Sequence, residues 1–124
     1  MSLARWLILL GAIVLFCGAI LHFIGYTFFI RVLIQSNLAP KYINAVRAVW
    51  LVFSLHMALL SIAIVWLSRL PGARGLVIFL ALIPTIDTIV MFHFVGLFVG
   101  TYAVGSAAIL LLLGAWLLPR NYAS

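Results

Sequence analysis

The chain has 124 residues, of which 69% are hydrophobic and only 6% are charged, and its mean hydropathy is +1.42. Ordinary soluble domains carry about 25% charged residues, so the composition excludes a water-soluble globular domain and predicts a single domain, residues 1–124, whose solvent is lipid. The net charge of +6 comes from seven Lys and Arg residues scattered near the ends of apolar runs, which excludes a nucleic-acid-binding surface.

The first apolar segment covers residues 6–26, and about 20 apolar residues suffice for one membrane crossing as a helix. It resembles the apolar part of a secretory signal but has no small-x-small cleavage site, so we predict an uncleaved span. Gly11, Gly18 and Gly25 recur every seven residues, and small residues let membrane helices approach closely. This stripe, which His22 shares, is therefore predicted to face the other helices.

The segment after the first span, residues 27–40, is too polar to be a span of its own. It either continues the first helix or forms a short interfacial helix, which would cover the outer mouth of the bundle. No glycine or proline hinge lies between Gly25 and Pro40, and this favours the continuation.

Three further spans are predicted, at about residues 42–70, 76–98 and 102–119. The apolar run over residues 76–119 would measure roughly 66 Å as one helix, which is enough for two crossings, so its turn is placed around residues 96–102. The fold class is thus an all-α integral membrane protein, an antiparallel four-transmembrane-helix bundle.

Aromatic and basic residues separate between the two ends of these spans. One end carries tryptophans and four arginines: Trp6, Trp66, Trp116, Arg5, Arg69, Arg74 and Arg120. The other end carries tyrosines and three basic residues: Tyr26, Tyr42, Tyr102, Arg31, Lys41 and Arg47. Because basic residues mark the cytoplasmic side, both termini are predicted to be cytoplasmic, in a bacterial cytoplasmic (inner) membrane.

Asp87 is the only acidic residue of the chain, and it lies inside an apolar run. An ionisable side chain at bilayer depth is costly, so it usually faces a protein interior, has a partner and marks a functional site. The candidate partners of Asp87 are Arg47, His22, His56 and His93. Of these, His22, Arg47 and His93 lie at depths that allow them to join Asp87 in the outer half of the bundle. We predict that these four residues form one polar site for ligand binding or proton relay. The structural explanation of Asp87 is a salt bridge to Arg47, or a neutral acid that is hydrogen-bonded to Thr88 or to a backbone carbonyl.

His56 is predicted to lie outside this site. Nine residues at about 100° each place it about 180° from Arg47 on an ideal helix, so it would contact a different neighbour, a second subunit or lipid. Arg47, Ser54 and Ser61 are seven residues apart and form a polar seam that is predicted to face the bundle.

These features favour a small polytopic membrane binding or accessory protein, surrounded by the lipid bilayer and associated with copies of itself or with a larger membrane complex. No segment outside the membrane is large enough for a catalytic domain, and no nucleophile–base pair or phosphate-binding loop occurs, which argues against an enzyme. The single cysteine, Cys17, allows no intramolecular disulfide and gives no metal-ligand spacing.

Two alternatives stay open. The first is an electron-transfer protein that holds one b-type haem between His22 and His93 as axial ligands, because the two histidines lie at matching depth on diagonal spans. The second is an intramembrane enzyme or a proton-coupled carrier in which Asp87 exchanges a proton with a neighbouring histidine.

Overall fold

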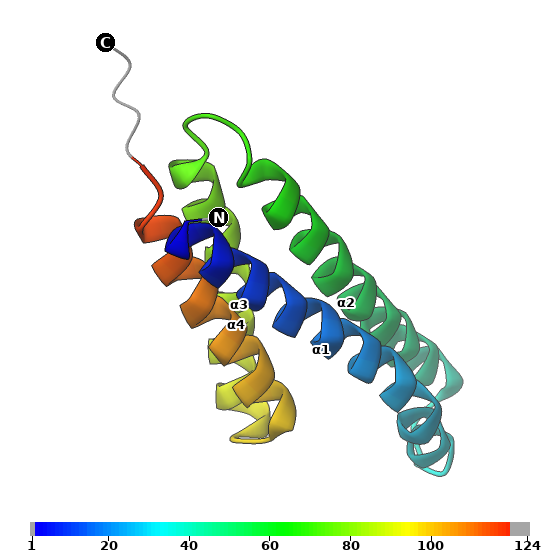
Figure 1. Cartoon of the computed structure of the whole chain (residues 1–124). Coiled ribbons are helices and arrows are strands. Elements are labelled where there is room, and N and C mark those ends of the chain that lie inside the picture. The colour runs from blue at the N-terminus through cyan, green and yellow to red at the C-terminus, as the bar shows by residue number, and fades with distance from the viewer. Residues whose placement is uncertain (1, 120–124) are drawn as a thin grey trace.

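The computed structural model describes residues 2–119, and within them the chain forms four helices and no strands. The helices are α1 (Leu3–Ile34), α2 (Pro40–Leu67), α3 (Arg74–Val95) and α4 (Val99–Trp116). Each is long and apolar enough to cross a membrane. The predicted all-helical four-helix bundle is therefore confirmed, and its helices run alternately in opposite directions (Figure 1).

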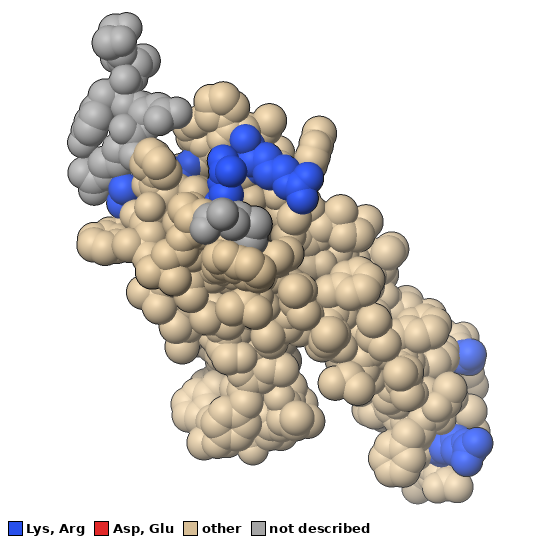
Figure 2. Space-filling view, viewed as in Figure 1, with Lys and Arg blue, Asp and Glu red and all other residues tan. Residues whose placement is uncertain are grey.

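The two ends of the bundle differ in what they carry. The start of α1, the turn between α2 and α3 and the end of α4 lie together, and we call this the termini end (Figure 1). The α1–α2 and α3–α4 connections lie at the opposite end, which we call the hairpin end. The predicted separation of basic residues agrees with the face drawn in Figure 2, where Lys and Arg lie at these two ends and none is visible between them. Arg120 lies outside the described residues.

Prolines and glycines determine where the helices begin and end. Pro40 occupies the first position of α2, where its missing N–H would have no helical partner. Gly72 and Gly96 have φ angles of 70° and 84°, a left-handed conformation that favours glycine, and they follow α2 and α3 respectively. Thr101 Oγ1 donates a hydrogen bond of 2.9 Å to the Gly96 carbonyl and closes the α3–α4 turn. The turn predicted around residues 96–102 is thus confirmed in its first part, residues 96–98, whereas residues 99–102 already belong to α4.

Helix α1 continues without interruption to Ile34, so the alternative of a separate interfacial helix over residues 27–40 is wrong. The reason is that no glycine or proline interrupts the helical hydrogen bonds before Pro40. At 1.5 Å per residue its 32 residues measure about 48 Å, compared with about 30 Å for the hydrocarbon core. Helix α1 therefore exceeds the thickness of the hydrocarbon core, and it can fit only by tilting or by extending into the headgroup region.

Packing is closest where α1 contacts α4, in the half of the bundle near the termini end. A Cβ added to Gly11 would lie 3.0 Å from the carbonyl oxygen of Ala107, and one added to Gly114 would lie 2.7 Å from Ile8 Cγ1. Only hydrogen fits at these two positions, and this allows the two backbones to approach closely.

The rest of the glycine stripe faces a different helix. Gly18 lies against Met57 and Gly25 against Trp50, both of which belong to α2. The stripe is thus the packed face of α1, as predicted, but it serves two neighbours in succession along the helix.

The bundle divides into two helix pairs toward the hairpin end (Figures 1 and 2). Within the described residues, α1 packs on α2 and α4, α3 packs on α4, and α2 contacts α3 only weakly. All buried residues of α2 lie from Ser54 onward, and all those of α3 lie at or before Pro84. The half near the hairpin end therefore consists of an α1–α2 hairpin and an α3–α4 hairpin, and the α2–α3 side between them is open.

Candidate functional site

Asp87 on α3 meets His56 on α2, with 3.5 Å between Asp87 Oδ2 and His56 Nε2. In the part of the chain that the structure describes, this is the only ion pair. The distance exceeds the 2.7–2.9 Å that is typical of a charge-assisted hydrogen bond. His56 Nε2 is itself buried and has no hydrogen-bond partner among the described residues. The imidazole and the carboxylate are thus close, but they do not form a hydrogen bond of ordinary length.

The pair lies deep in the membrane-spanning region. Asp87 precedes the end of α3 at Val95 by eight residues, or about 12 Å along the helix axis. The side chains of His56 and Asp87 are 38% and 24% exposed, so part of each reaches the surface of the bundle on the open α2–α3 side. At this depth that surface meets lipid or another protein.

The prediction that His56 lies apart from Asp87 is wrong. The helical angle behind it holds, because Arg47 faces α1 whereas His56 faces α3 on the other side of α2. The error was to place Asp87 on the side of Arg47. Helix α3 does not contact α1 within the described residues, so Asp87 meets the opposite face of α2.

Arg47 belongs to the α1–α2 hairpin. Its Nε donates a hydrogen bond of 3.0 Å to the hydroxyl of Tyr26, and both residues are partly or largely exposed. The salt bridge between Arg47 and Asp87 is therefore not formed. The other residues of the predicted seam, Ser54 and Ser61, are buried, which confirms that this face of α2 is packed.

His22 faces the interior of the same hairpin, as predicted. Its Nδ1 lies 2.8 Å from Ser54 Oγ, which itself donates to the carbonyl of Trp50 at 3.1 Å. Because the serine proton is used in this way, His22 Nδ1 is assigned as the donor of the first hydrogen bond.

Trp50 holds His22 from a second direction. The two rings stack with 4.0 Å between their centroids, and Trp50 Nε1 donates a hydrogen bond of 2.8 Å to the His22 carbonyl. Phe29 stacks on Trp50 at 4.1 Å. The surroundings of His22 are those of a residue that joins α1 to α2.

His93 is exposed near the end of α3, and its ring meets the edge of Phe94 at 4.8 Å. It contacts neither Asp87 nor His22 through any hydrogen bond or ring contact among the described residues. No group of three His, Cys, Asp or Glu residues that could hold a metal ion occurs in residues 2–119. The haem alternative gains no support from this arrangement.

The structure thus does not bring the four predicted site residues together. Sequence reasoning named His56 among the candidate partners of Asp87 but wrongly excluded it from the site. One signal pointed to His56, namely that it lies at the same depth as Asp87, near the middle of its span. Phe53 links the two histidines of the region, with its ring 5.1 Å from that of His22 and 6.1 Å from that of His56. Comparisons of the chain with protein-family models, curated proteins and solved structures found no match.

Proposed function

We propose that this protein is a small membrane binding or accessory protein whose open α2–α3 side binds a transmembrane helix of a larger membrane complex. The observation that carries the proposal is the His56–Asp87 pair, whose side chains are partly exposed at bilayer depth and lie 3.5 Å apart, longer than a charge-assisted hydrogen bond. A polar side chain from a partner helix, such as a serine, threonine or asparagine, would hydrogen-bond to the exposed part of this pair, since His56 Nε2 itself is buried.

The cost of the pair in lipid supports the proposal. An aspartate at the centre of a membrane helix costs about 2.5–3.5 kcal/mol on insertion scales. A contact of 3.5 Å to a partly exposed imidazole offsets only a part of this cost, because the remaining carboxylate surface still faces the outside of the bundle. A partner that covers the pair with a hydrogen-bonding group would offset more of it.

The residues around the pair suit a helical partner. Val52 and Leu59 flank His56 on one face of α2, and they are 64% and 58% exposed. Val90 flanks Asp87 on α3 at the helical spacing of three residues and is 49% exposed. A partner helix could pack its apolar side chains on these residues and place its polar group at the pair.

For the orientation in the membrane, we propose that the termini end lies in the cytoplasm. It holds Arg5, Arg69 and Arg74, and Arg120 follows in the sequence, whereas the hairpin end holds three basic residues. The excess of positive charge supports this orientation in the cytoplasmic membrane of a bacterium.

A second function, an intramembrane enzyme or a proton-coupled carrier, is favoured by one observation. An imidazole and a carboxyl group 3.5 Å apart at bilayer depth can exchange a proton, which is a common use of such residues in transporters. A proton role requires a titratable group at position 87, whereas a binding role requires only a polar one. Asp87→Asn therefore separates the two functions, because it would end proton exchange but keep a hydrogen-bonding group for the partner.

The proposal is tested by the size of the complex in mild detergent. Wild-type protein extracted from its native membrane should elute with a larger partner, and light scattering would give the mass of protein in that complex. The variant His56→Leu/Asp87→Leu should elute as the chain alone, and a matched change on the exposed face of α4, Ile109→Leu, should leave the complex intact. A complex of unchanged mass in the double variant would refute the proposed role of the pair.

A further inference from the structure

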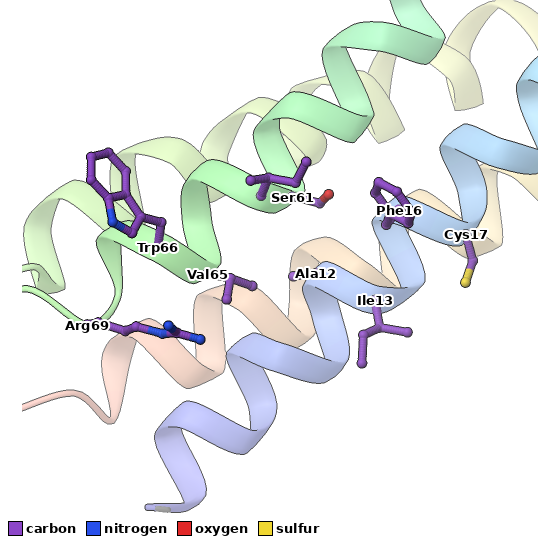
Figure 3. Close-up of a pocket in the computed structure, with 9 residues that line it drawn as sticks. Ala12, Ile13, Phe16, Cys17, Ser61, Val65, Trp66 and Arg69 are labelled. Carbon is purple, nitrogen blue, oxygen red and sulfur yellow. The ribbon is translucent and has the colours of Figure 1, made fainter.

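A groove between α1 and α2 opens on the surface near the termini end (Figure 3). It has a volume of about 420 Å³, and its walls include Ile13 and Phe16 from α1 and Ile62 and Val65 from α2. The one serine in the lining, Ser61, uses its hydroxyl in a hydrogen bond of 2.7 Å to the carbonyl of Ala58. The groove is therefore apolar along its length and suits a hydrocarbon chain.

The groove ends at a basic pocket. Arg69 lines the groove and also lines a second cavity of about 180 Å³, to which Arg5 and Arg74 contribute as well. Figure 3 shows the Arg69 side chain at the end of the groove, extending toward α1. Two contacts with the end of α4 and the residues after it hold the Arg74 side chain. Its Nη1 donates a hydrogen bond of 3.4 Å to the carbonyl of Leu118, and its guanidinium lies 6.0 Å from the centre of the Trp116 ring.

The positive charge of this pocket has no acidic side chain to balance it. Asp87 is the only acidic residue in the chain, and its carboxylate lies beside His56 on the α2–α3 side. Three arginines around one cavity therefore favour an anion from outside the chain, and a phosphate is the group that guanidinium matches in both charge and geometry.

The level of the pocket identifies the source of that phosphate. Trp6, Trp66 and Trp116 lie at the same end of the helices, and tryptophan prefers the headgroup level of a bilayer. A phosphate at this level and an apolar groove that continues from it into the hydrocarbon region match the two parts of a phospholipid. Basic pockets between membrane helices are known sites for anionic headgroups.

We infer that the termini end binds one anionic phospholipid, with its phosphate among Arg5, Arg69 and Arg74 and one acyl chain in the groove between α1 and α2. Arginines that merely extend to the headgroups would attract all anionic lipid equally and hold none in place. The shared position of Arg69 in the pocket and in the groove distinguishes this site from such a surface. The inference does not depend on the His56–Asp87 pair or on the partner proposed for it.

Native mass spectrometry of the purified full chain tests the site. The probes are dioleoyl phosphatidylglycerol, dioleoyl phosphatidylcholine and glycerol phosphate, at equal concentrations. Wild-type protein should retain one phosphatidylglycerol with a preference of about tenfold or more over phosphatidylcholine. Phosphatidylglycerol has a net negative charge that phosphatidylcholine lacks, and about two arginines would contact this charge. Glycerol phosphate should bind far more weakly, since it has no acyl chain for the groove.

Two pairs of variants separate the pocket from total charge and the groove from general apolar surface. Arg5→Gln/Arg69→Gln should abolish the preference for phosphatidylglycerol, whereas Arg31→Gln/Lys41→Gln removes the same charge at the opposite end and should keep it. Val65→Phe should fill the groove and weaken both lipids, whereas Val49→Phe on the exposed surface of the same helix should weaken neither.

Circular dichroism would verify that each variant is folded; if the arginine variant is not, the comparison of Val65→Phe with Val49→Phe decides. Equal binding of both lipids to wild-type protein, equal loss in the two charge variants, or equal binding after Val65→Phe and Val49→Phe would overturn the site. Binding of glycerol phosphate as tight as that of phosphatidylglycerol would overturn the role of the groove.

Discussion

His56 Nε2 and Asp87 Oδ2 lie 3.5 Å apart across the α2–α3 side of the bundle, at the boundary between its packed half and its open half. Asp87 thereby faces the side of α2 opposite to Arg47, whose guanidinium is bound to Tyr26 of α1. Asp87 and Arg47 thus take part in different helix contacts, Asp87 between α2 and α3 and Arg47 between α1 and α2.

The first prediction concerns the energy of this pair. In a double-mutant cycle with His56→Gln and Asp87→Asn, the two residues should show a coupling energy of about 0.6–1.7 kcal/mol, the range of polar contacts between membrane helices. The stabilities would be measured by unfolding in mixed micelles with increasing sodium dodecyl sulfate. A cycle of Asp87→Asn with Arg47→Gln is the control and should be additive, since no contact joins these residues. Coupling to Arg47 and none to His56 would contradict the structure.

Much of the fold could be predicted from the sequence. The length of the apolar segments predicted the four helices. The spacing of Gly11, Gly18 and Gly25 predicted the packed face of α1, and Gly96 lies at the start of the segment predicted to form the last turn. These features depend on local properties of the chain, namely the length needed to cross a membrane, the space that small residues leave and the φ angles that glycine permits.

The partner of Asp87 could not be predicted in the same way. In a water-soluble helix the polar side marks the solvent, but a membrane helix is apolar on its lipid side and on its packed side alike, so periodicity does not show which face meets which neighbour. His56 and Arg47 were correctly placed on opposite faces of α2. Which of the two faces meets α3 depends on the arrangement of the helices, and it is this arrangement that the structure supplies.

A second prediction concerns Trp50, which joins α1 to α2 through the His22 carbonyl, the His22 ring and the Phe29 ring. Trp50→Leu removes all three contacts and should destabilise the protein by about 1–3 kcal/mol, since each aromatic pair contributes about 0.5–1.5 kcal/mol. Hydrogen exchange should become faster over residues 22–34. Trp66→Leu is the matched control, because Trp66 is 66% exposed. Similar exchange in both variants would show that Trp50 does not join the helices.

A third prediction concerns the contact between α1 and α4. Gly114→Ala would place a Cβ 2.7 Å from Ile8 Cγ1 and 2.9 Å from the Ala4 carbonyl oxygen. Because the second contact is to backbone, the helices must separate, and the protein should lose about 1–3 kcal/mol of stability. Gly75→Ala in α3 meets nothing within 4 Å and should be neutral or slightly stabilising. The free energy of unfolding of the two variants would be measured in mixed micelles. Equal values would show that α1 and α4 lie farther apart at Gly114 than the structure indicates.

A fourth prediction concerns orientation. Cysteines introduced by Ser2→Cys and Asn37→Cys, each with Cys17→Ser, lie at the termini end and in the α1–α2 connection respectively. A membrane-impermeant thiol reagent applied to intact cells should label position 37 and leave position 2 unlabelled, because we propose that the termini are cytoplasmic. Labelling at position 2 alone would indicate the opposite orientation. The proposed phospholipid would then lie in the outer leaflet.

The proposed partner surface is tested most directly by photo-crosslinking in the native membrane. A photoreactive amino acid at position 52 lies beside His56, and the same residue at position 109 lies on α4; Val52 and Ile109 are 64% and 60% exposed, so both sites are equally accessible. The proposal predicts an adduct of one defined mass from position 52, none from position 109, and loss of the first adduct in His56→Leu/Asp87→Leu. Leucine at both positions removes the ion pair without leaving one of its charged groups unpaired, so that loss would report on binding. Equal adducts from both positions, or an adduct from position 52 that survives the double substitution, would contradict it.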